Sequence, residues 1–151
     1  MLGGWESFSP RATSGQIVAR IWAWRTAGNL VFRLRGGKMM RQDDLFSEVS
    51  SALQFPWYFG ENWDALDECM KDLDWFPTPN GIYVVITDAK MVLRDDGQDL
   101  EVFVDCLNSM IDEFSVPIAL GESWDRPALP CVISLADEPD LSRWSQAGAR
   151  I

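Results

Sequence analysis

The strongest constraint on the fold is a continuous apolar run, Gly81 to Ala89 (GIYVVITDA), which is bounded by turn residues. Such a run indicates a strand that is buried on both faces, as at the centre of a parallel sheet. Asn29 to Gly36 (NLVFRLRG) alternates between apolar and polar residues and predicts a second strand. Pro130 to Leu135 (PCVISL) predicts a third. The chain therefore places three strand-like segments far apart in sequence.

Helix-period segments separate these strands. Asp43 is a candidate N-cap for a helix that ends before Pro56, and a second helix is expected to begin near Asn62. Asp99 is a candidate N-cap for a third helix, whose apolar residues continue at helical spacing to Phe114. The order strand, two helices, strand, helix, strand predicts an α/β layer fold with a three-stranded parallel sheet packed against helices.

The two ends of the chain give weaker signals. Residues 1–15 are rich in Gly, Ser and Pro and are expected to form a loose arm. Gln16 to Trp24 alternates loosely, which is compatible with an extra N-terminal strand at the edge of the sheet. The residues after Asp137 show no periodicity and are expected to be a tail.

Composition restricts the partners and the compartment. The chain has 13 basic and 23 acidic residues, a net charge of -10, which repels nucleic acid and anionic membranes and speeds encounter with a basic protein. Acidity also serves solubility alone. Cys69, Cys106 and Cys131 are far apart and form no C-x-x-C pair, so we expect buried thiols rather than zinc or disulfides. Without a signal peptide pattern or an apolar run of roughly 18 residues, a cytoplasmic location is expected.

The helix that begins near Asn62 has two distinct sides. On a helical wheel, one arc holds Trp63, Ala65, Leu66, Cys69, Met70 and Leu73, and the other holds Asp64, Asp67, Glu68, Lys71 and Asp72. Such a charged arc is ordinarily a solvated face. However, Trp57, Tyr58 and Phe59 precede it, and aromatics beside carboxylates also suit a cationic partner, because aromatics anchor and charges steer. The residues alone leave both interpretations open.

An enzyme or a metal site is the weaker alternative. The chain has no histidine, and no pair of nucleophile and base is visible. Arg94 to Asp99 (RDDGQD) fails as a calcium loop, because aligning Gly97 with the invariant glycine puts Val92 and Arg94 at ligand positions. Two carboxylates of the acidic helix could in principle hold a divalent cation. We expect no cofactor and no metal.

Phe55 to Met70 (FPWYFGENWDALDECM) resembles the signature of the barstar family, intracellular inhibitors of small basic bacterial ribonucleases. The family pattern is Pro, any residue, two aromatics, Gly-Glu-Asn, an apolar residue, Asp-Ala-Leu, any residue, an acid, Cys and a hydrophobic residue. The matching residues are, in order, Pro56, Tyr58, Phe59, Gly60, Glu61, Asn62, Trp63, Asp64, Ala65, Leu66, Glu68, Cys69 and Met70. The resemblance implies a barstar-like domain over residues 29–136, an N-terminal extension over 1–28 and a C-terminal tail over 137–151.

The resemblance also implies a partner and a mechanism. In the family, this helix and its preceding loop enter the ribonuclease active site, and the acids take the place of substrate phosphates. Carried over, Asp64 and Glu68 would face the catalytic Arg, Lys and His groups, and Tyr58 would pack over the catalytic histidine. The other expected contact residues are Phe59, Asn62, Trp63 and Asp67, with Trp75 as a candidate aromatic after the helix.

This sequence departs from the family pattern in several places. The second helix acid is usually Asp and is Glu68 here, and an often aromatic position holds Asp67. A further family acid lies on the helix before the last strand, where Asp105 and Asp112 are the candidates. The chain is longer than a typical member, through its N-terminal segment, the loop Gly121 to Pro130 and the tail. These departures leave open an alternative partner, a different nuclease or toxin.

Overall fold

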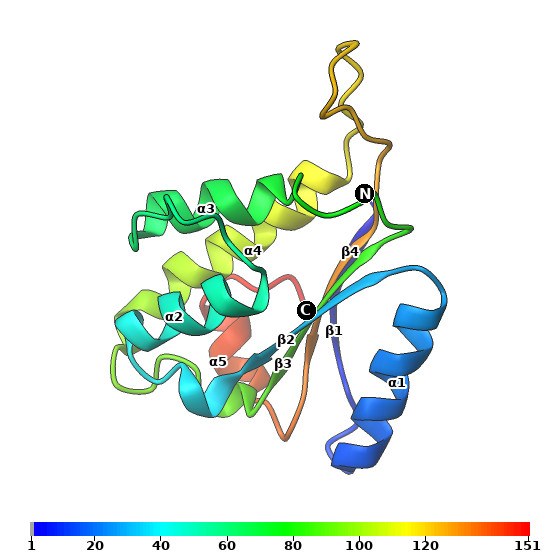
Figure 1. The fold of residues 1–151 in the computed structure, drawn as a ribbon. Helices are drawn as coiled ribbons and strands as arrows, with labels where there is room; N and C mark the ends of the chain where they lie inside the picture. Colours follow the sequence, from blue (N-terminus) through cyan, green and yellow to red (C-terminus); the bar gives the residue numbers. More distant parts are fainter. Residues whose placement is uncertain (1) are drawn as a thin grey trace.

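The computed structural model describes residues 2–151 and has a four-stranded parallel sheet at its centre (Figure 1). The strands are β1 (Gly3–Ser7), β2 (Leu30–Arg35), β3 (Ile82–Thr87) and β4 (Cys131–Leu135), in the spatial order β1-β4-β3-β2. The α/β class, the parallel sheet and the three expected strands are confirmed. The expected number of strands is wrong by one, because β1 adds an edge.

The central position of β3 is confirmed by its pairing and its burial. Val84 pairs with Phe32 of β2 on one side and with Ile133 of β4 on the other. Val84 belongs to the larger hydrophobic cluster, whereas the next residue, Val85, belongs to a smaller cluster on the opposite face. A strand covered on both faces needs apolar residues at successive positions, which explains its unbroken apolar sequence.

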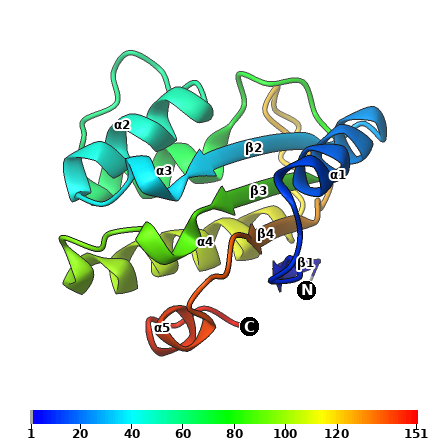
Figure 2. The ribbon, with the colours of Figure 1, turned by 90° about the horizontal axis from the view of Figure 1, so that it is seen from below.

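Four helices cover the face of the sheet that carries the larger hydrophobic cluster: α2 (Gln42–Ala52), α3 (Trp63–Asp72), α4 (Leu100–Phe114) and α5 (Leu141–Gln146) (Figure 2). Short 3-10 turns lie at Gly36–Lys38, Ala89–Met91 and Gly97–Asp99. The N-cap of α2 is Arg41, not Asp43 as predicted; Asp43 lies in the first turn, where a carboxylate still favours the helix dipole. Asp99 is the N-cap of α4 as predicted, although its side chain makes no capping hydrogen bond.

The opposite face is covered by α1 (Ser14–Thr26), which corrects the predicted strand at Gln16–Trp24. Ile17 and Ile21 lie one turn apart and pack on the sheet, so the loose alternation concealed a helical spacing. The helix begins with a capping box: the Thr13 hydroxyl accepts from the Gln16 backbone amide (3.2 Å), and the Gln16 side-chain oxygen Oε1 accepts from the Thr13 backbone amide (2.8 Å).

The extra N-terminal strand exists, but it is β1, within the segment expected to be a loose arm. Its five residues pair in parallel with β4, from Gly3 opposite Cys131 to Ser7 opposite Leu135. Gly3 has φ +77°, and a Cβ at this position would clash with the Cys131 backbone. The glycines that suggested disorder therefore permit a close approach to β4.

The tail is also folded onto the body of the protein. Asp140 caps α5 by accepting from the Arg143 amide (3.1 Å), and Trp144 is fully buried. The Trp144 indole N–H donates to the Ala89 carbonyl (3.3 Å), and its ring lies 5.9 Å from that of Trp5. One aromatic anchor on a six-residue helix leaves no periodicity in the sequence, which is why the helix was missed. The domain boundaries at 29 and 136 stay a prediction.

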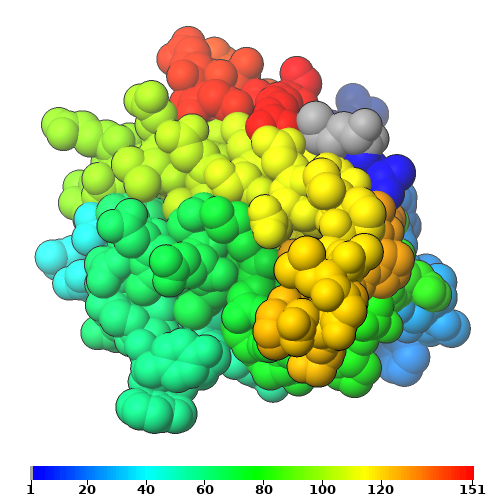
Figure 3. Space-filling view, turned by 90° about the horizontal axis from the view of Figure 1, so that it is seen from above, coloured from blue at the N-terminus to red at the C-terminus, as the bar shows by residue number. Residues whose placement is uncertain are grey.

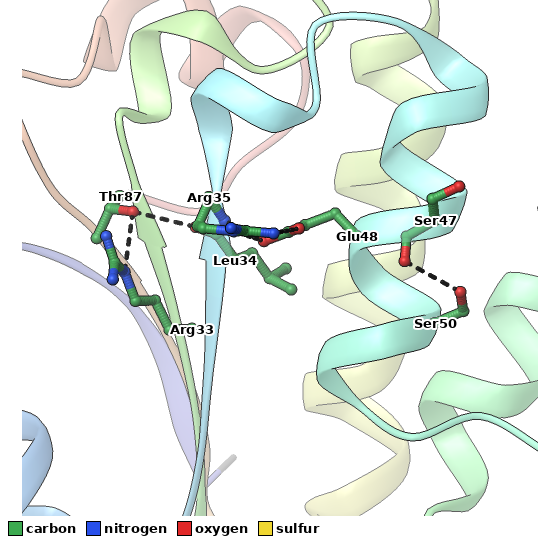
Figure 4. A network of polar contacts seen from close by, with 7 residues as sticks. All are labelled: Arg33, Leu34, Arg35, Ser47, Glu48, Ser50 and Thr87. Atoms are coloured by element: carbon green, nitrogen blue, oxygen red, sulfur yellow. Dashed lines mark hydrogen bonds and ion pairs between the residues drawn. The ribbon is translucent and has the colours of Figure 1, made fainter.

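A polar network fastens α2 to the free edge of β2 (Figure 4). The Arg35 guanidinium donates two hydrogen bonds to Glu48, of 2.8 and 2.7 Å, and the Arg35 amide donates a third of 2.9 Å. The Thr87 hydroxyl accepts from Arg33 Nε and donates to the Leu34 carbonyl, both at 3.4 Å. Because Glu48 accepts from the Arg35 backbone amide, this amide of the edge strand is not available for pairing with another chain. The same network holds α2, and the aromatic loop follows α2 in the chain.

Candidate functional site

Helix α3 is oriented by its cap and its apolar side. Asn62 is the N-cap: its side-chain oxygen Oδ1 accepts from the Ala65 backbone amide (2.8 Å), and its side-chain nitrogen Nδ2 donates to the Gly60 backbone carbonyl (3.2 Å). Leu66 and Met70 are completely buried in the main core. The predicted division of the helix is confirmed, because burial of this side turns the opposite, acidic side outward.

The aromatic loop, residues 55–61, divides its aromatic side chains between core and solvent. Trp57 is 95% exposed and Tyr58 is 63% exposed, with their rings edge to face at 5.9 Å. Phe59 turns inward and packs on Phe55 (5.1 Å) and Phe46 (6.2 Å). The loop projects from the surface beside α3 (Figure 3, teal). Two large aromatics are thus held in solvent by a third that anchors the loop.

Several predicted contact residues also have roles inside the molecule. Trp63 is half-buried, with its ring 5.0 Å from Phe46 and 6.5 Å from Phe103. Trp75 donates its indole N–H to the Leu53 carbonyl (3.0 Å). These two side chains, like Phe59 and the cap Asn62, hold α3 and its loop in place. Their contact with a partner stays a prediction.

The predicted acids of α3 differ in what they contact. Asp64 and Glu68 are exposed and lie one turn apart on the outer side. Asp67 is half-buried and forms an ion pair with Lys71 at 2.9 Å. Because Lys71 is the only basic residue of α3, the outer side of the helix keeps a strong negative charge.

The candidate acids of α4 are distinguished by their surroundings. Asp112 forms a bidentate pair with Arg150, at 2.7 and 2.8 Å. Asp105 is exposed and precedes Cys106 in the chain. Burial raises the pKa of the Cys106 thiol to about 12, and the Asp67, Asp105 and Asp64 carboxylates add to that rise. Of the two, Asp112 is engaged by Arg150 within the molecule, and contact of Asp105 with a partner stays a prediction.

Sequence reasoning left Trp57 out of the site, although it is the most exposed aromatic of the loop. Its position in a run of three aromatics directly before the charged helix was the available signal. Sequence reasoning placed Asp72, the last residue of α3, on the charged arc but not in the site, and it missed Asp74, which extends the acidic surface beyond the end of α3. Burial and the nearby Asp74 carboxylate raise the pKa of Asp72. The acidic surface is therefore longer than the family signature.

The cysteines and the helices further define the chemistry of the described residues. Cys69, Cys106 and Cys131 are free and buried as predicted, and burial raises the pKa of Cys131 to about 12, which makes it a poor nucleophile. Across residues 2–151, no group of three or more His, Cys, Asp or Glu side chains is arranged to hold a metal ion. Within the same residues, no helix combines the length and apolar character needed to cross a membrane.

Comparison with known protein families identifies the class of this fold and surface. A family model described as Barstar (barnase inhibitor) matches residues 29–120, from the start of β2 through α4 into the following segment. The chain belongs to the barstar family. A comparison with curated proteins finds no match. The matched residues include the aromatic loop and α3, whereas β1, α1, β4 and α5 lie outside them.

Proposed function

We propose that this protein is a stoichiometric, non-catalytic inhibitor of a small basic bacterial ribonuclease. The aromatic loop and α3 enter the nuclease active site, where the acids replace substrate phosphates. The observation that carries the proposal is the pair Asp64 and Glu68, exposed one turn apart beside the exposed Tyr58, within the family-matched segment. We propose that the protein acts in the cytoplasm, where it would guard the producing cell against its own toxin.

The geometry suits a mimic of phosphates. Carboxylates accept charge-assisted and bidentate hydrogen bonds from arginine, as phosphate oxygens do. Asp64 and Glu68 lie on a helix that is anchored by the buried side chains of Leu66 and Met70, so the backbone holds the two acids one turn apart on the same side. Tyr58 and Trp57 supply rigid apolar area beside them, which is how aromatic residues anchor an interface.

The electrostatics support rapid capture of a basic partner. The net charge of -10 produces a long-range field that attracts a basic protein. We expect the association rate to fall as salt rises, because the field is screened within about 10 Å at 0.1 M ionic strength. Stopped-flow measurement of association at several salt concentrations tests this. A rate indifferent to salt would remove the electrostatic part of the proposal.

The decisive experiment is a titration of RNA cleavage by a small basic bacterial ribonuclease with this protein. We expect cleavage to stop at one-to-one stoichiometry and to return with Asp64→Asn. The matched control is Glu6→Gln, because Glu6 lies on the edge strand β1 and the substitution changes the net charge equally. Equal loss of inhibition in both variants would point to the general field rather than to the α3 surface.

Three alanine substitutions test the assignment of individual residues. Asp64→Ala, Tyr58→Ala and Glu68→Ala should each weaken inhibition and leave the fold intact, because all three side chains are exposed. Circular dichroism and the urea midpoint of each variant measure the fold. A variant that unfolds would show that its residue is structural and would remove it from the proposed surface.

The alternative is a different nuclease or toxin bound by the same acidic surface. It is favoured by Glu68 and Asp67, which depart from the family pattern, and by the segment after residue 120, which lies outside the family match. Capture from the source cell, with the Asp64→Asn variant as control, discriminates between them. Recovery of a basic deoxyribonuclease in place of a ribonuclease would favour the alternative.

A further inference from the structure

The segment between α4 and β4 forms a hairpin that stands beside α3. Ile118 and Arg126 pair as an antiparallel bridge, with amide-to-carbonyl distances of 2.9 and 3.0 Å. Between them, the Asp125 carboxylate accepts from the amides of Leu120 (3.0 Å) and Gly121 (2.7 Å). Figure 1 shows the hairpin extending away from the sheet beyond the end of α4. The bridge thus joins the two sides of the hairpin, and the Asp125 side chain braces its tip.

Arg126 fastens the hairpin to the acidic helix. Its guanidinium donates to the carbonyls of Asp72 (2.9 Å) and Lys71 (3.1 Å) at the end of α3, and it lies 4.0 Å from the centre of the Phe114 ring. An arginine at a helix C-terminus satisfies carbonyls that have no partner within the helix. The hairpin and α3 are thus joined, and the position of one fixes the other.

The hairpin holds apolar side chains in solvent. Leu120 is 72% exposed and Trp124 is 51% exposed, and Val116 at the base of the hairpin is also exposed. A tryptophan left in water does not contribute the free energy that its burial in the core would give. Clusters of exposed apolar residues mark interaction surfaces. A half-exposed tryptophan on a fastened hairpin resembles the aromatic anchors of protein interfaces, which are pre-organised before binding.

An acidic groove connects Trp124 with the proposed site on α3. It has a volume of about 480 Å³ and is lined by Glu68, Lys71, Asp72, Asp74, Glu113, Ile118, Trp124 and Arg126. Both cations are engaged, Lys71 with Asp67 and Arg126 with the α3 carbonyls. Glu68 belongs both to this groove and to the surface proposed to enter the nuclease. The space-filling view shows the hairpin (gold) on the same face as α3 (green) and α4 (yellow) (Figure 3).

We propose that the hairpin Ile118–Arg126 is a second arm of the nuclease-binding surface, in which Trp124 packs on the partner and the groove receives one of its lysine or arginine side chains. The inference rests on the proposed function and specifies which nucleases are bound. The occupant is the basic protein held by α3, because the groove is acidic and is continuous with α3 through Glu68. Residues 121–126 lie outside the family match, so this arm distinguishes the chain from the shared family surface.

The test compares two tryptophans on opposite faces of the full-length protein. Trp124→Ala should raise the dissociation constant for the small basic ribonuclease about tenfold or more, as for a buried aromatic anchor. Trp22→Ala is the matched control, because Trp22 is 69% exposed on α1, across the sheet from α3. Leu120→Ser, at a more exposed position of the same hairpin, should weaken binding without affecting the urea midpoint.

A spectroscopic readout locates the contact directly. In protein labelled with 5-fluorotryptophan, the ¹⁹F resonance of Trp124, assigned by its loss in Trp124→Phe, should shift when the ribonuclease binds, and that of Trp22 should not. Normal binding by Trp124→Ala and Leu120→Ser, with Asp64→Asn still impaired, would overturn the second arm alone. A wild-type protein that does not bind the ribonuclease at all would overturn the proposed function, and the second arm with it.

Discussion

The part of the molecule that carries α1 and the part that carries α3 have similar structural features but opposite charge. Residues 2–42, which form β1, α1, β2 and the first 3-10 turn, contain seven basic residues and one acid, Glu6. Residues 43–151 contain six basic and 22 acidic residues. Both parts have a helix with a side-chain cap and an exposed tryptophan, Trp22 on α1 and Trp57 before α3. Exposure of aromatics alone therefore does not define the binding face.

The difference in charge decides which face suits a basic partner. A basic nuclease is attracted to α3 and α4 and repelled from α1, so the same field that speeds association also orients it. The packing differs as well: the α2–α5 face covers the main core, whereas α1 covers the small cluster Ile17, Ile21, Val31, Val85 and Ala136. The acidic surface is thus built on the more deeply packed side.

The largest expected effect contrasts the packing of the two faces. Leu66→Ala should cost about 3–5 kcal/mol of unfolding free energy, because Leu66 is completely buried beneath α3. Ile21→Ala removes a side chain of the same size from beneath α1 and should cost about 2 kcal/mol, since this smaller cluster relaxes more easily. Urea unfolding measures both. Equal costs would show that the two layers are packed alike.

The next effect contrasts the charges. Glu68→Lys should weaken ribonuclease binding by roughly 2 kcal/mol or more, the usual effect of changing a key interface residue. The measurements behind this general value include inhibitors of this family. Arg11→Glu makes the basic face more acidic and should leave affinity almost unchanged, because Arg11 lies beside α1. Surface plasmon resonance gives both values. If Arg11→Glu strengthened binding as much as Glu68→Lys weakened it, total charge rather than location would control affinity.

A smaller effect contrasts the two helix caps. Thr13→Ala on α1 and Asn62→Ala on α3 should each cost about 1 kcal/mol of stability, because each removes the acceptor of a helix amide. Only Asn62→Ala should also weaken ribonuclease binding, since it releases the aromatic loop. Asn62→Asp retains an acceptor and should restore stability. Thermal unfolding and the cleavage titration together measure these effects, and weaker binding in Thr13→Ala would contradict the separation of the faces.

The smallest effect concerns the junction of the two parts, where Arg35 meets Glu48. The hydrogen bonds from Arg35 lower the pKa of Glu48 below its ordinary value of 4.5. For a carboxylate with a lowered folded-state pKa, the stabilisation is fully present above 4.5 and is lost as pH falls through the folded-state value. The stability advantage of wild type over Glu48→Gln should therefore shrink on acidification, as urea midpoints at neutral and acidic pH would show. An advantage that grows in acid would reverse this assignment.

Much of the fold and of the candidate site follows from local sequence pattern. The unbroken apolar run of β3, the wheel of α3 and the Asn62 cap were predictable, because each reflects burial or capping within a few neighbouring residues. The buried cysteines followed from their apolar neighbours. The outward direction of Asp64 and Glu68 followed from the same wheel.

Other features depend on contacts between residues far apart in the chain. The N-terminal segment becomes β1 because β4 offers it a free edge, and Trp144 anchors α5 because Trp5 and Phe103 surround it. The inward turn of Phe59 and the clamp of Arg126 on α3 are likewise long-range contacts. Periodicity encodes which side of an element is buried, whereas the identity of its neighbour depends on the whole chain. Sequence alone therefore determined the acidic helix, and the tertiary structure decided which aromatic side chains stand beside it.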